Sequence, residues 1–195
     1  MKIIGSFPKT RLRRLRQHKW LRNLISENNL SPNDLVLPVF VREGSNKIES
    51  IESMPGVKRY TIDKLNTILK EVKKHKIPMI ALFPYVSNKK KDNIGSEALN
   101  PNNLICKSLR LIKKKFPEIG VMCDVALDPY TSHGHDGVMI NNQIDNDQTI
   151  SILAEQALLQ ARMGADIIAP SDMMDGRIGI IRKILDENNY KNISI

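Results

Sequence analysis

The fold is decided by the stretch from 119 to 171, which contains IGVMCDVAL (119–127), QTISILAEQALLQARM (148–163) and ADIIAPS (165–171). The first and last of these runs are short and largely apolar, as in strands that are buried on both faces of a sheet. The middle run is long and carries apolar residues at helical spacing. A strand, a helix and a second strand in this order predict a βαβ unit with parallel strands.

The same alternation extends along the rest of the chain. Further strands are predicted at 35–41, 77–84 and 192–195, and further helices at 61–75, 101–116 and 176–189. Thr61 is expected to be the N-cap of the first of these helices. No Gly-rich dinucleotide fingerprint follows the first strand, which disfavours an open Rossmann sheet. A complete (β/α)₈ TIM barrel takes about 250 residues, so this pattern fits roughly its first half. With open strand edges, such a half is expected to fold poorly alone.

Two segments are expected: a basic N-terminal arm with a short helix at 1–30, and an incomplete barrel domain at 31–195. The 195 residues include 30 Lys and Arg against 21 Asp and Glu, a net charge of +9, and 41% are hydrophobic. That apolar share excludes wholesale disorder. Because aromatic residues make up only 5% and the lysines are scattered, nucleic-acid binding through the arm is the least favoured alternative.

The cysteine content and the longest apolar runs indicate the compartment. Cys106 and Cys123 are too few for a disulfide framework and are expected to be buried, reduced thiols of a cytoplasmic protein. No apolar run reaches the roughly 18–20 residues that a membrane-spanning helix needs. A membrane partner is therefore not expected.

Functional side chains of a parallel α/β barrel follow the carboxyl ends of its strands, and the first such loop is CDVALDPYTSHGHDG (123–137). It offers acidic and imidazole side chains at Asp124, Asp128, His133, His135 and Asp136. Oxygen-rich sets of this kind suit a hard cation such as Mg²⁺. A polar turn whose side chains satisfy loop backbone groups explains the pattern equally well.

The second loop is APSDMMDGRIG (169–179), which follows the next predicted strand. Ser171 is the functional candidate, because its hydroxyl is expected to point into the mouth of the barrel. Asp175 is expected to cap the helix that follows. Between the two loops, 138–147 is predicted to form a hairpin or loop that could cover the site.

Taken together, these segments resemble the porphobilinogen synthase (delta-aminolevulinic acid dehydratase) family over nearly the whole chain. The motifs that carry the resemblance are RLRRLR (11–16), VLPVFVREG (36–44), SMPGVKRYTID (53–63), ALFP (81–84), DVALDPYTSHGHDG (124–137) and APSDMMDGRIG (169–179). The resemblance implies a (β/α)₈ barrel that condenses two 5-aminolevulinate molecules to porphobilinogen with loss of two waters, a lyase step of tetrapyrrole and heme biosynthesis.

The resemblance also implies roles for the arm and for lysines. An N-terminal arm that includes Arg11 and Arg13 would embrace a neighbour in a homo-octamer. Two Schiff-base lysines of the family would lie beyond Ile195, so the chain is expected to be an inactive fragment by itself. A non-catalytic truncated subunit or interaction protein is the alternative.

The resemblance further assigns the site residues. Asp124 and Ser171 line the site, and Tyr130, His133, His135 and Asp175 support the motif. The family's zinc cysteines are replaced here by Ala126, Asp128 and Asp136. Without thiolates no catalytic zinc is expected, and the carboxylates suit Mg²⁺, with K⁺ as a further cation.

Overall fold

The computed structural model of the chain describes residues 5–195 and consists of two compact units, Met1–Ser31 and Pro32–Ile195. The smaller unit spans nearly the same residues as the arm expected at 1–30, whose first four residues lie outside those described. It contains the 3₁₀ helix η1 (Leu12–Arg16) and the α-helix α1 (Lys19–Leu24), neither of which buries a residue. Among residues 5–31 none is buried, and large apolar side chains such as Trp20 and Leu24 are exposed.

The larger unit is built on a six-stranded sheet with the order β2-β3-β1-β4-β5-β8. Its strands are β1 (Val36–Arg42), β2 (Ile48–Ser50), β3 (Lys58–Thr61), β4 (Met79–Tyr85), β5 (Gly120–Val125) and β8 (Ile167–Pro170). All neighbours are parallel except β2 and β3, which form an antiparallel hairpin. The predicted α/β class with a parallel sheet is confirmed.

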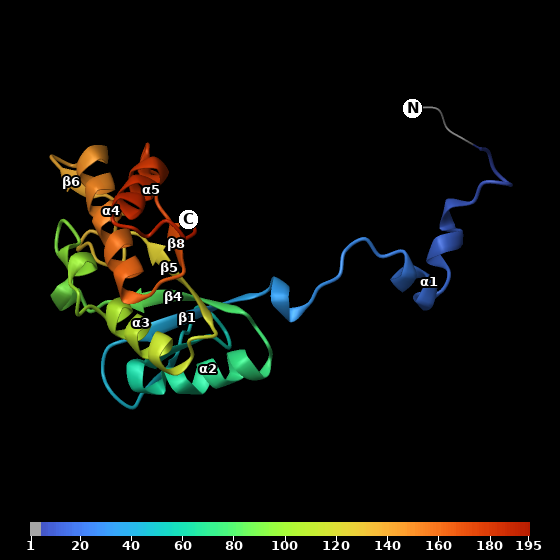
Figure 1. Ribbon diagram of the computed structural model, residues 1–195, viewed down its shortest axis with the longest axis horizontal. Coiled ribbons are helices and arrows are strands. Elements are labelled where there is room, and N and C mark those ends of the chain that lie inside the picture. The colour runs from blue at the N-terminus through green and yellow to red at the C-terminus, as the bar shows by residue number, and fades with distance from the viewer. Residues whose placement is uncertain (1–4) are drawn as a thin grey trace. The chain divides into compact units, whose positions relative to one another are not determined.

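Four α-helices follow one another along the sheet in chain order (Figure 1). They are α2 (Leu65–Lys74), α3 (Leu104–Lys115), α4 (Asn146–Met163) and α5 (Arg177–Glu187). Each contributes buried apolar side chains to the common core; in α3 these include Ile105, Leu109 and Ile112. The Asn103 side chain caps α3 by accepting a hydrogen bond from Cys106 N at 2.8 Å.

Three expectations differ in detail from the structure. The hairpin β2–β3 was not predicted, because its strands are only three and four residues long. Thr61 is not a side-chain cap: its hydroxyl donates to Lys47 O and accepts from Lys47 N, both at 3.1 Å, which ties it to the hairpin. Of the predicted strand at 192–195, the structure shows one parallel bridge between Ile167 and Ser194.

The segment 138–147 does form a hairpin, with β6 (Val138–Ile140) antiparallel to β7 (Gln143–Asp145). Both cysteines are buried and free, and burial raises the pKa of the Cys106 thiol to about 11. Within residues 5–195, no helix is long and apolar enough to cross a membrane.

The packing of α3 leads to a stability prediction. Leu109 is completely buried, so Leu109→Ala is expected to lower the free energy of unfolding by about 2–5 kcal/mol through lost burial and a residual cavity. Lys107→Ala, an exposed position on the same helix, should change it by about 0.5 kcal/mol or less. Urea denaturation of the natural-length protein provides the comparison. Equal losses in the two variants would show that α3 is not part of the core.

Candidate active site

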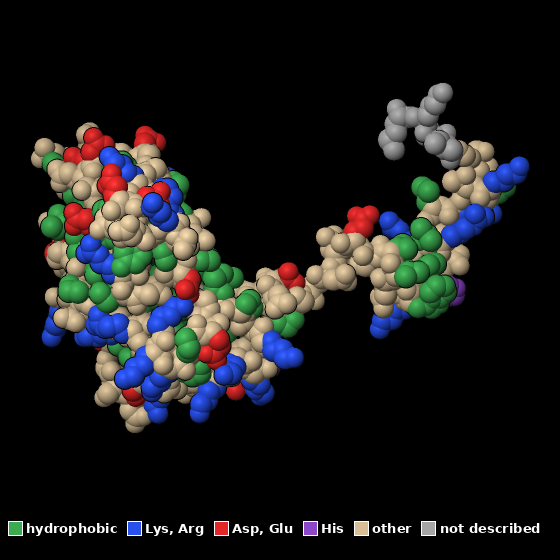
Figure 2. Space-filling model, in the orientation of Figure 1, with side chains coloured by type: hydrophobic (Ala, Val, Ile, Leu, Met, Phe, Trp, Pro, Cys, Tyr) green, Lys and Arg blue, Asp and Glu red, His purple; other side chains and the backbone are tan. Residues whose placement is uncertain are grey.

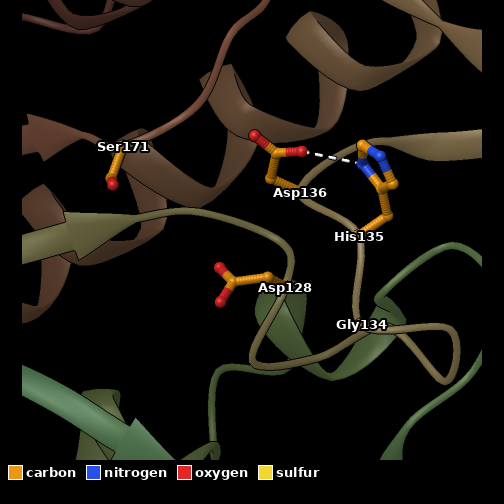
Figure 3. Close-up of a pocket in the computed structure, with 5 residues that line it drawn as sticks. All are labelled: Asp128, Gly134, His135, Asp136 and Ser171. Carbon is orange, nitrogen blue, oxygen red and sulfur yellow. Dashed lines mark ion pairs between the residues drawn. The ribbon is translucent and has the colours of Figure 1, made fainter.

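A cavity of about 360 Å³ opens where β5 and β8 end (Figure 3). It is lined by Asp128, Gly134, His135, Asp136 and Ser171. The first four belong to the loop after β5, and Ser171 directly follows β8. Parallel pairing is what brings these two loops together, because the carboxyl ends of neighbouring parallel strands meet at one edge of the sheet.

Two buried glutamines on α4 hold the end of β5 in place. Gln160 Nε2 donates to the backbone oxygen of Asp124 at 2.9 Å, and Gln156 Nε2 donates to that of Ala126 at 3.3 Å. Both carbonyls lie at the point where the strand gives way to the loop. The glutamines thereby satisfy backbone groups that sheet pairing leaves open, and they fix the strand end from which the loop departs.

The predicted residues Tyr130 and His133 support the loop rather than line the cavity. Tyr130 is buried, with its backbone N–H donating to Leu127 O at 2.8 Å. His133 Nδ1 accepts the backbone N–H of His135 at 3.1 Å, and its Nε2 lies 3.2 Å from Asn93 O. Since Nδ1 accepts, Nε2 is the protonated nitrogen and donates to Asn93. His133 therefore connects this loop to the loop after β4.

His135 and Asp136 form a pair at the wall of the cavity. His135 Nδ1 lies 2.8 Å from Asp136 Oδ1, and the dashed line in Figure 3 marks this contact. The imidazole is half exposed, whereas the carboxylate is mostly buried. Thr131 Oγ1 fixes the backbone here by donating to His135 O at 2.7 Å.

The loop after β8 is fixed by a carboxylate to which the sequence analysis assigned no role. The Asp172 side chain is fully buried, and its Oδ1 accepts from Met174 N at 2.7 Å and lies 3.1 Å from Arg177 Nε. Its Oδ2 is buried without a hydrogen-bond partner. The residue type and its place after a strand were visible in the sequence, but its burial depends on the packing of the two loops.

Asp175 does not cap α5, which corrects the expectation. The N-cap is Gly176, at a φ of 77° that favours glycine, and no side chain caps the helix there. The backbone N–H of Asp175 instead donates to Asn146 Oδ1 at 2.7 Å. Asp175 therefore lies in a turn that is attached to α4.

Carboxylates crowd this edge of the sheet. Burial raises the pKa of Asp124 to about 7, with Asp128 and Asp172 contributing through charge repulsion. Burial likewise raises the pKa values of Asp128 and Asp172, and the charge of Asp136 adds to both shifts. A pKa of about 7 would allow Asp124 to exchange a proton near neutral pH, although Asp124, which was expected to line the site, is not among the residues that line the cavity. A cation here would relieve the repulsion.

The donor set fits a hard cation held partly by water. Asp128 and Asp136 offer carboxylate oxygens on one cavity, with the Ser171 hydroxyl beside them. Across residues 5–195, no three His, Cys, Asp or Glu side chains are grouped closely enough to form a complete protein cage. Mg²⁺ is commonly bound by one or two carboxylates while retaining several waters, so the residues present suit it.

The raised pKa of Asp124 predicts a pH dependence of stability. Its folded pKa of about 7 exceeds the ordinary aspartate value of 3.8, so the folded state binds more protons between these values and stability falls as pH rises through this window. Asp124→Asn removes the titration. With cations chelated, its free energy of unfolding relative to the unaltered protein should rise by up to about 1.4 kcal/mol per pH unit between pH 4 and 7. If urea denaturation shows the same change in the free energy of unfolding with pH for both proteins, the raised pKa is not that of Asp124.

The chain is similar to known proteins in both sequence and fold. The family profile described as delta-aminolevulinic acid dehydratase matches residues 9–195. The delta-aminolevulinic acid dehydratase of Bradyrhizobium diazoefficiens is 52% identical over 185 residues, covering 95% of this chain and 52% of the relative. That of Methanothermus sociabilis is 43% identical, covering 97% of this chain and 58% of the relative. The chain thus spans about half the length of the curated relatives it matches.

The fold is also similar to that of a solved structure. The crystal structure of delta-aminolevulinic acid dehydratase (porphobilinogen synthase) from Toxoplasma gondii ME49, in complex with the reaction product porphobilinogen, superposes with a TM-score of 0.91 at 38% identity. The match covers 94% of this chain and 52% of that one. The predicted TIM barrel, of which this chain forms the N-terminal part, is confirmed. The chain belongs to the delta-aminolevulinic acid dehydratase family.

Proposed function

We propose that the protein carrying this chain is a lyase of tetrapyrrole biosynthesis that condenses two molecules of 5-aminolevulinate to porphobilinogen, releasing two molecules of water. The observation that carries the proposal is the cavity of carboxylates and Ser171 at the carboxyl ends of β5 and β8, in a chain of this family. The Toxoplasma gondii enzyme is in complex with porphobilinogen as its reaction product, which supports the same chemistry here.

This chain would contribute one wall of the active site. Asp124, with a pKa of about 7, would accept or release a proton, and Ser171 would orient a polar group of the substrate. No lysine lines this cavity among the residues described. We therefore propose that the Schiff-base lysines implied by the resemblance come from sequence outside these 195 residues, and that this piece alone is inactive.

Asp128 and Asp136 would hold the cation, with Mg²⁺ as the first choice and K⁺ as a further one. Carboxylate oxygens and an absence of thiolates among the lining residues support a hard cation over zinc. When bound, Mg²⁺ would supply positive charge that polarises a neighbouring oxygen atom. The residues of this chain would hold it beside Ser171 and limit the repulsion among the carboxylates.

The arm is proposed to join copies of the protein into a homo-oligomer, an octamer by the resemblance. Its large apolar side chains are exposed: Leu12 at 85%, Trp20 at 66% and Leu24 at 76%. Figure 2 shows green apolar side chains gathered on this segment beside blue Lys and Arg. Exposed apolar side chains gathered on one segment are typical of a surface that binds another protein. A cytoplasmic location is part of this proposal.

Porphobilinogen formation as a function of Mg²⁺ concentration tests the function and the cation together. The natural-length protein should convert 5-aminolevulinate, and Asp136→Asn should raise the Mg²⁺ concentration for half-maximal activity by about tenfold or more, because it removes a charged ligand. Glu155→Gln, an exposed charge change on α4, should leave it unchanged. No product with either cation would refute the function, and equal Mg²⁺ curves for Asp136→Asn and the unaltered protein would refute the assigned cation site.

Light scattering tests whether the arm joins copies of the protein. Trp20→Asp places a charge on the exposed apolar surface of α1 and should shift the protein toward a smaller assembly at the same concentration, because burying an unpaired charge is costly. Lys19→Ala on the same helix serves as the control. An unchanged molar mass for Trp20→Asp would count against assembly through the arm.

A further inference from the structure

The turn Ser171–Gly176, which carries a cavity residue at its first position, is attached at its far end to α4 by one side chain. Asn146, the first residue of α4, accepts the backbone N–H of Asp175 through Oδ1 at 2.7 Å and donates through Nδ2 to Asp175 O at 3.3 Å. A carboxamide can make this pair of bonds because it offers an acceptor and a donor side by side. The Asn146 side chain is therefore both a hydrogen-bond acceptor and a hydrogen-bond donor to the Asp175 backbone.

Three further hydrogen bonds hold the rest of the turn, one near its start and two around Met174. Ser171 N donates to Val125 O at 3.0 Å, which continues the β5–β8 pairing. Arg177 Nη1 donates to Met174 O at 2.6 Å, and the Asp172 carboxylate accepts a hydrogen bond from Met174 N. Asn146 adds a connection between the turn and helix α4.

The turn also packs directly against the segment that carries Asp136. Met174 is 5% exposed and lies over Gly137, where an added Cβ would come within 3.0 Å of Met174 Cε and 2.7 Å of Ile144 Cγ2. The Met174 methyl group therefore lies close to the Gly137 backbone, and this contact connects the turn to the segment that carries Asp136. In Figure 3, Asp136 and Ser171 lie around the same hollow.

We propose that Asn146 is a positioning residue of the active site. It holds the Asp175 end of the turn on α4, so that Met174 stays on Gly137 and the Ser171 hydroxyl and Asp136 carboxylate keep their separation across the cavity. The inference rests on the proposed function for its catalytic consequence, whereas the attachment itself is a property of the fold.

Amide hydrogen exchange tests the attachment in the natural-length protein. Asn146→Ala removes both bonds and should accelerate exchange of the Asp175 amide by about tenfold, because this amide loses its hydrogen-bond acceptor. Asn146→Asp keeps the size and the Oδ1 acceptor, and an acidic residue is favourable at a helix N-terminus, so this variant should fold and show a smaller acceleration. Gln148→Ala, an exposed amide on the same helix, should leave the Asp175 amide unchanged.

Activity measurements on the same variants test whether the attachment positions the active site. Asn146→Ala should lower kcat and raise the Mg²⁺ concentration for half-maximal activity by about tenfold each, with Asn146→Asp in between and Gln148→Ala unchanged. Unaltered Asp175 exchange in Asn146→Ala would overturn the attachment. Faster exchange with unchanged kcat and Mg²⁺ dependence would overturn the positioning role. Lack of turnover by the unaltered protein would refute the proposed function instead, and the exchange comparison would still decide the attachment.

Discussion

The parallel pairing of β5 with β8 is the constraint on which the candidate site depends. Its register sets Asp124 beside Ala169 and Val125 beside Pro170, and the pairing continues into the loop through the hydrogen bond from Ser171 N to Val125 O. Two loops that are more than 30 residues apart in the sequence therefore leave the sheet at the same level. The helix α4 that connects these strands completes the arrangement, because Gln156 and Gln160 hold the end of β5 and Asn146 holds the turn after β8.

The site carries an electrostatic cost that the surrounding fold offsets. Burial and mutual repulsion raise the pKa values of Asp124, Asp128 and Asp172, so these groups would be more stable apart or in water. A hydrogen bond from Met174 N and the positive charge of the nearby Arg177 compensate the Asp172 carboxylate, but its Oδ2 has no hydrogen-bond partner. Buried acidic groups kept together against their own repulsion are typical of a place where chemistry, rather than stability, determines the residues.

The long strands and helices were predicted correctly from the sequence, whereas the hairpin β2–β3 was not. Strands such as β4 and helices such as α3 show a clear apolar pattern over seven or more residues, and that pattern directly reflects which face is buried. The hairpin β2–β3 has three and four residues, too few for a periodicity to be recognised. Thr61 and Asp175 were expected to cap helices because their residue types favour caps, but tertiary hydrogen bonds to Lys47 and Asn146 use these positions differently.

By itself, the sequence determined the α/β class, the order of strands and helices, and the two loops that carry the carboxylates, because periodicity and the chain order of motifs are local properties. It also determined the family through the motifs in those loops. Only the tertiary structure decided which polar side chains share the cavity and which act as supports: Asp128, His135, Asp136 and Ser171 line it, whereas Tyr130 and His133 hold the loop. The physical reason is that burial, pKa and hydrogen-bond partners depend on contacts between segments far apart in the chain, such as Asn146 with Asp175 and Met174 with Gly137.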